Sequence, residues 1–146
     1  MISVASHYLG GLNPSSMKNL FCAIFLLLAC GSYGQTQLEM NTDAANEYKK
    51  ADAALNSVYK KVMKKYASDA AFIKNLKAAQ RLWIQFRDAE LKMKYPLDAS
   101  EYGSIFPMCR SFYLTELTNT RTATLQVWLD GIEEGDACGG SVGVKE

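Results

Sequence analysis

The residues best suited to chemistry in this chain are carboxylates, arginines and cysteines, because imidazole is almost absent. The 146-residue sequence holds a single histidine, His7, which precedes a segment that we expect to be removed. Its loss excludes a Ser-His-Asp or Cys-His catalytic unit and a zinc site that uses histidine. A glycan hydrolase would use Asp88 and Glu90 as its two carboxylates. These residues are two positions apart on a predicted helix, so their side chains do not face each other. The pattern favours a binding protein without catalysis, metal or cofactor.

Two cysteines, Cys109 and Cys138, follow the segment expected to be removed. In an oxidising compartment such a pair predicts a disulfide, whereas a reactive thiolate would need more activation than Arg110 alone supplies. A straight helix between the two cysteines would hold their sulfurs about 40 Å apart, too far for a bridge. We therefore expect either a break in the third helix within 111–118 or a segment after Ile132 that folds back.

The N-terminal part of the sequence has the features of an export signal. Lys18 and an uninterrupted apolar run, 20–29, precede a small-residue cleavage pattern at 32–35, so residues 17–34 are predicted to be a signal peptide. An apolar run of about ten residues is too short to span a bilayer. Residues 1–16 show no periodicity and are interpreted as a start site placed too early. The alternative is a lipoprotein anchored through Cys30; either interpretation places the protein outside the cytoplasm.

A length of 146 residues is typical of one domain of ordinary size. The formal net charge of +1 gives no reason to expect a nucleic acid partner. Removal of the leader takes away one of 16 basic residues and none of the 15 acidic ones, so the remainder is formally neutral. We expect a helical domain over 35–138 and a flexible tail over 139–146.

Apolar residues recur every three or four positions in three stretches, which predicts an all-α fold. The first helix is expected over 42–66. The second begins after an N-cap signal at Ser68-Asp69 and ends at Tyr95-Pro96. An ordered loop follows, and a third helix, marked by apolar residues over 112–132, ends near Gly135. Helices of this length predict an elongated antiparallel three-helix bundle.

Seven polar residues fall beside the apolar stripes, where a buried charge costs several kcal/mol unless it is paired. The simplest arrangement pairs Asp52 or Asp88 with Arg121 or Arg87 across helices. Two interpretations remain: a network that fixes helix register and loops, or a groove for a partner or ligand. The seven residues are Asp52, Asn56, Gln80, Arg87, Asp88, Thr118 and Arg121.

These residues also carry a resemblance to a known family. The motifs, in chain order, are Ala51-Asp52-x-x-Leu55-Asn56-x-x-Tyr59, Ala79-Gln80-x-x-Trp83-x-x-Phe86-Arg87-Asp88, Tyr102-Gly103-Ser104 and Leu117-Thr118-x-x-Arg121-x-x-x-Leu125. Their order and spacing resemble the LprI-like family of lysozyme inhibitors. The resemblance implies an exported, small, helical, non-enzymatic domain that binds a lysozyme. The chain departs from the family at two positions that often hold cysteine, where its neighbourhoods read Ala44-Ala45 and Ala89-Glu90-Leu91.

Two surfaces are candidates for contact with a protein partner such as a lysozyme. One is the loop with Tyr102, Gly103 and Ser104, since tyrosine is a common interface anchor; its alternative role is a structural cap for the third helix. The other is the acidic cluster Glu133, Glu134 and Asp136, whose alternative role is a solvated face. A competing hypothesis is a structural or stress-related envelope protein that binds another envelope component.

Overall fold

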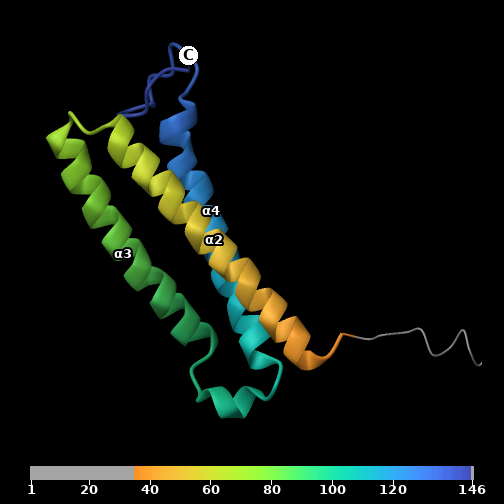
Figure 1. The fold of residues 1–146 in the computed structure, drawn as a ribbon. Helices are drawn as coiled ribbons and strands as arrows, with labels where there is room; N and C mark the ends of the chain where they lie inside the picture. The colour runs from red at the N-terminus through yellow and green to blue at the C-terminus, as the bar shows by residue number, and fades with distance from the viewer. Residues whose placement is uncertain (1–34, 146) are drawn as a thin grey trace, which may run out of the picture. The chain divides into compact units, whose positions relative to one another are not determined.

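A computed structural model describes residues 35–145, of which Thr36 onward form one compact unit (Figure 1). The prediction of an all-helical fold is confirmed by α2 (Gln37–Lys65), α3 (Ala70–Lys94), the short 3-10 helix η1 (Ala99–Tyr102) and α4 (Phe106–Asp130). Over this range, no helix is long and apolar enough to cross a membrane. The predictions for 1–16, 17–34 and Cys30 lie outside the described residues.

The ends of the helices are set by capping side chains. Thr36 and Glu39 form a reciprocal capping box, so α2 starts before the predicted first apolar residue. Asp69 accepts a hydrogen bond from the Phe72 backbone N–H and begins α3 where the sequence predicts. α4 begins at Phe106, earlier than expected, because Pro107 lies in the first turn, where proline is tolerated.

α2 and α4 run side by side in the same direction, and α3 returns in the opposite direction (Figure 1). At one end of the pair, Asn41 Nδ2 donates a hydrogen bond to the Ser104 carbonyl at 2.9 Å. At the other end, Lys65 Nζ donates to the Leu129 carbonyl and the Tyr66 hydroxyl donates to the Trp128 carbonyl. These contacts fix the register between α2 and α4.

The core lies mainly along the seam between α2 and α4. Leu55, Val58 and Val62 of α2 pack with Leu125 of α4, and all four are buried. α3 contributes one buried residue, Leu76, and makes far fewer contacts with α4 than α2 does. α3 therefore covers the α2–α4 pair only in part, and an open groove remains along it.

The predicted disulfide between Cys109 and Cys138 is wrong, because both are free thiols in the structure. α4 is unbroken from Phe106 to Asp130, with Cys109 in its first turn and Cys138 beyond its far end. The helix between them is about 30 Å long, and a bridge needs Cα atoms within about 7 Å. Neither expected bend, within 111–118 or after Ile132, brings the cysteines together.

The C-terminal segment, expected to be a flexible tail from residue 139, makes hydrogen bonds with the end of α4 and with Tyr66. The Lys145 backbone N–H donates to the Ile132 carbonyl at 2.9 Å, beside an isolated parallel bridge between Ile132 and Val144. The Gly143 N–H donates to the Tyr66 hydroxyl, and Trp128 Nε1 donates to Ser141 Oγ at 3.1 Å. The sequence does not reveal these contacts, because they join residues of ordinary type that lie apart along the chain.

Candidate binding groove between α3 and α4

The polar pair on α2 is local to that helix. Asn56 Nδ2 donates to the Asp52 carbonyl and to Asp52 Oδ2, each at 2.9 Å. These bonds join positions four apart on one helix, so they do not link helices. The expected pairing of Asp52 with an arginine of another helix is not formed.

Arg87 connects α3 to α2, but through a tyrosine. Its Nη1 donates to the Tyr48 hydroxyl at 3.2 Å, while its Nε and Nη2 donate to Oδ1 of the neighbouring Asp88. The guanidinium also lies over the Trp83 ring, 5.5 Å from its centroid. The Arg87–Asp88 pair therefore forms within α3 rather than across helices, and it orients Arg87 toward Tyr48.

Arg121 is the arginine of α4 that faces α3, and it has no carboxylate partner among residues 35–145. Its Nε donates to Gln80 Oε1 at 3.1 Å, and no described acid lies within ion-pair distance. Burial lowers the pKa of Arg121 below its ordinary value. Arginine still keeps its charge at neutral pH, so the groove wall carries a partly desolvated cation.

Thr118, one helical turn before Arg121, is fully buried, and its hydroxyl has no hydrogen-bond partner in the described part of the protein. Such an orphaned hydroxyl carries an uncompensated desolvation cost. Thr122 differs, since its hydroxyl donates to the Thr118 carbonyl at 2.9 Å. The two threonines therefore form a matched pair for substitution.

Thr118→Val should raise the free energy of unfolding by about 1 kcal/mol, because it replaces an unpaired buried hydroxyl with a methyl group of the same shape. Thr122→Val, which makes the same change at a bonded hydroxyl on the same helix, should alter it by less than about 0.5 kcal/mol. Urea unfolding followed by circular dichroism measures both. A loss of stability in Thr118→Val alone would show that its hydroxyl is bonded in solution.

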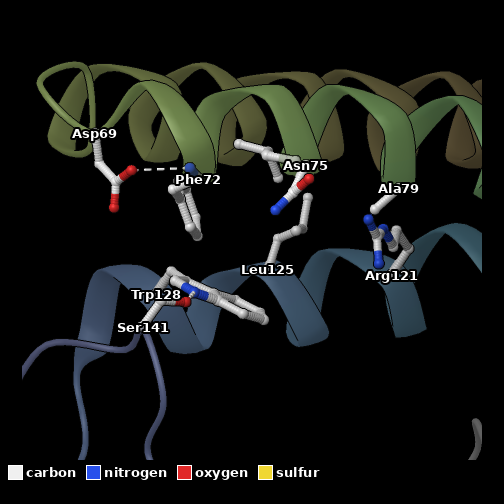
Figure 2. A pocket seen from close by; sticks show the side chains of 9 residues that line it. Asp69, Phe72, Asn75, Ala79, Arg121, Leu125, Trp128 and Ser141 are labelled. Carbon is white, nitrogen blue, oxygen red and sulfur yellow. Dashed lines mark hydrogen bonds between the residues drawn. The ribbon is translucent and has the colours of Figure 1, made fainter.

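A cavity of about 390 Å³ lies between α3 and α4 (Figure 2). Phe72, Asn75 and Ala79 reach into it from α3, and Arg121, Leu125 and Trp128 reach into it from α4. Asn75 and Ala79 are solvent-exposed although they line it, so the cavity is an open groove. Its full lining is Asp69, Phe72, Asn75, Leu76, Ala79, Arg121, Leu125, Trp128 and Ser141.

The apolar end of the groove is built from aromatic rings held in place by their neighbours. Phe72 stacks on Tyr66 at 4.4 Å between ring centroids and lies 6.3 Å from Trp128. Trp128 is held in place by the hydrogen bond from its Nε1 to Ser141 Oγ. Sequence periodicity assigns Phe72, Leu125 and Trp128 to a core. They line a shared cavity because α3 packs only loosely against α4. The groove thus combines an apolar floor with a cation, a composition that suits binding.

No group of acids and cysteines over 35–145 could hold a metal ion. Of the seven polar residues singled out from the sequence, only Arg121 lines the groove, with Gln80 hydrogen-bonded to it from α3. Asp52, Asn56, Arg87 and Asp88 lie elsewhere along the helices. The structure therefore brings two of the seven polar residues together across helices by a direct hydrogen bond.

The loop around Tyr102 seats the start of α4. Tyr102 accepts a hydrogen bond from the Leu97 backbone N–H at 3.0 Å and stacks on Phe106 at 5.0 Å. Gly103 has φ of 71°, a left-handed conformation that favours glycine. Ser104 uses its carbonyl to accept from Asn41. Gly103 and Ser104 are exposed, whereas the Tyr102 ring is already engaged within the protein.

The acidic cluster lies in the segment that follows α4. Glu133 pairs with Lys145 at 2.6 Å, and Asp136 Oδ1 accepts a hydrogen bond from the Cys138 backbone N–H at 2.8 Å. All three acids, Glu134 included, are exposed. The same segment supplies Ser141 to the groove, so the cluster and the groove belong to the same end of the domain.

Comparison with known proteins identifies the family. No solved structure matches the chain significantly. An uncharacterized protein of Rhizobium meliloti (strain 1021) is 34% identical over 109 residues, which cover 67% of this chain and 77% of that protein. The family model described as Lysozyme inhibitor LprI matches residues 29–125, which include α2, α3 and most of α4. The chain therefore belongs to the family of lysozyme inhibitor LprI.

Proposed function

We propose that this protein is an exported envelope protein that binds a lysozyme-type muramidase and inhibits it without chemistry of its own. The observation that carries the proposal is the match of the lysozyme inhibitor family over residues 29–125. The match includes the helices that build the groove. Binding, rather than catalysis, suits a groove that pairs one cation with apolar side chains.

The acidic cluster Glu133, Glu134 and Asp136 is the surface that we propose for the first encounter with the lysozyme. Animal lysozymes are cationic, and exposed charge of the opposite sign accelerates association. Lys145 offsets part of this charge through its pair with Glu133. The loop of Tyr102, Gly103 and Ser104 is the competing contact, because it exposes a glycine and a serine beside an aromatic cluster.

Replacing Glu133, Glu134 and Asp136 by their amides should slow association with an animal lysozyme about tenfold at low salt, with a smaller effect as salt rises. Surface-immobilised lysozyme and a stopped-flow or biosensor readout measure the rate. The matched control neutralises three exposed acids that lie away from the cluster, Asp98 and Glu101 in the loop region before α4 and Glu116 within α4. An effect confined to the control would place the contact at the Tyr102 loop, and no binding by the wild-type protein would contradict the proposed function.

A further inference from the structure

The groove between α3 and α4 contains an arginine whose binding capacity is mostly unused. A guanidinium has five N–H donors, and Arg121 uses only its Nε, toward Gln80. Within residues 35–145, no protein acceptor bonds its two terminal nitrogens, and no acid pairs with it. A carboxylate fits these two nitrogens in a bidentate manner.

The stretch of α3 that flanks the groove is strongly biased in charge, whereas α4 as a whole is balanced, with Arg110 and Arg121 against Glu116 and Asp130. From Ala70 to Arg87, α3 carries Lys74, Lys77, Arg81 and Arg87 and no acidic residue. The stretch of α4 over 117–129 carries Arg121 and no acid. Asp69, at the end of the groove, already accepts from the Phe72 N–H. The unpaired Arg121 and the basic stretch of α3 beside the groove favour an acidic occupant.

The walls of the groove define a second requirement, an apolar group. Phe72 and Trp128 line the end away from Arg121, and Leu125 lies between that end and Arg121 (Figure 2). Arg121 and Trp128 are seven residues apart on α4, which is two helical turns or about 10 Å. A carboxylate and a bulky apolar side chain that fill both ends must be separated by a similar distance. Residues seven apart on a helix have this spacing.

The openness of the groove favours a protein segment over a free small molecule. Enclosed pockets bury most of a small ligand, whereas here two lining residues, Asn75 and Ala79, remain exposed to solvent. A segment held by a partner protein covers an open groove and gains contact along α3, where Leu82 and Phe86 are 63% and 54% exposed. Both features extend the interface beyond the cavity itself.

We propose that the α3–α4 groove binds an acidic segment of a protein partner, with a Glu or Asp carboxylate on Arg121 and an apolar side chain among Phe72, Leu125 and Trp128. The inference rests on the proposed function only in taking the partner to be a protein. It assigns to the groove a recognition chemistry that differs from the electrostatic encounter at the acidic cluster.

The test uses synthetic helical peptides of about 14 residues, or four helical turns, titrated into the full-length protein. One peptide carries Phe and Glu seven positions apart, and its twin carries Gln in place of Glu. The Glu peptide should bind about tenfold more tightly than the Gln peptide, because a carboxylate forms a bidentate ion pair with the guanidinium and a neutral amide does not. Tryptophan fluorescence of a Trp83→Phe background, in which Trp128 is the remaining tryptophan, reports the apolar end, and the NMR signal of the Arg121 Nε–H reports the other end.

Two isosteric amide-to-carboxylate variants locate the site without removing Arg121. Asn75→Asp places a negative charge on the groove wall, and Gln85→Glu places one on an exposed position of α3 outside the cavity lining. Asn75→Asp should lower the affinity for the Glu peptide about tenfold, and Gln85→Glu should leave that affinity within about twofold of the wild-type value. Circular dichroism of both variants verifies that helix content is unchanged.

Three results would overturn the inference: equal affinity for the Glu and Gln peptides, equal loss in both variants, or phenylacetate binding as tightly as the Glu peptide, which would indicate a small-molecule site. Formation of dimers by the protein alone, with α3 protected, would assign the groove to a second copy and would also overturn it. No lysozyme is present in this assay. A failure of the peptide test is therefore distinguishable from a failure of the proposed function.

Discussion

Leu55→Ala should lower the free energy of unfolding by about 3 kcal/mol, since it removes a fully packed side chain and leaves a cavity. Leu55 is 2% exposed and packs with Val58, Val62 and Leu125 in the seam between α2 and α4. Because α3 covers this seam only in part, few neighbours are available to collapse into the space. The midpoint of urea unfolding, followed by circular dichroism, measures the change.

The matched control is Leu82→Ala on α3, where the leucine side chain is 63% exposed. Its effect should be below about 0.5 kcal/mol, because an exposed leucine has little buried area to lose. Equal urea midpoints for the two variants would mean that the hydrophobic core is not the α2–α4 seam. A larger loss in Leu82→Ala would mean that α3 packs closely against a partner or a second copy in solution.

Gly131→Ala should also cost roughly 3 kcal/mol, or else detach the C-terminal segment from α4. Gly131 has φ of 77° and ends α4, and a Cβ there would lie 2.8 Å from the Lys145 backbone nitrogen and 2.9 Å from the Gly143 carbonyl oxygen. Those neighbours are backbone atoms held by the bonds between Ile132 and the chain at 143–145, so they cannot move aside cheaply.

Gly140→Ala serves as the control that separates the steric clash expected at Gly131 from the backbone strain of a positive φ. Gly140 also has a positive φ, 57°, but a Cβ there meets nothing within 4 Å. Its cost should be about 1 kcal/mol, the ordinary penalty for a left-handed alanine. Urea unfolding compares the two variants, and tryptophan fluorescence in a Trp83→Phe background reports whether the Trp128–Ser141 bond persists. Equal costs would show that residues 143–145 do not pack on Gly131.

Hydrophobic periodicity predicts the helices well because their apolar stripes and caps are local features. The stripe of α3 illustrates the limit, since Phe86 fits the period of its neighbours yet is 54% exposed. Periodicity shows that a helix has an apolar face, but the surface that covers this face depends on contacts between distant parts of the chain. The partial coverage by α3, which creates the groove, could not be predicted from the stripe.

The polar residues show the same limit. The sequence identifies Arg87 and Arg121 as cations beside apolar stripes, but their partners depend on how far one helix is displaced along another. Across helices, Arg87 therefore meets Tyr48 and Arg121 meets Gln80, where a pairing with acids was expected. The disulfide prediction is wrong for a related reason, because it assumed that a break in the third helix or a folded-back segment after Ile132 would bring two distant thiols together.

The most direct test of the central claim, that this protein inhibits a lysozyme by binding it, is a muramidase assay. Full-length protein is titrated against an animal lysozyme that clears a suspension of bacterial cell wall, with lysozyme concentration held constant. We predict a saturable loss of clearing that approaches completion at excess protein, and no clearing by the protein alone. Undiminished lysozyme activity in the presence of excess folded protein would contradict the claim and would favour binding to another envelope component.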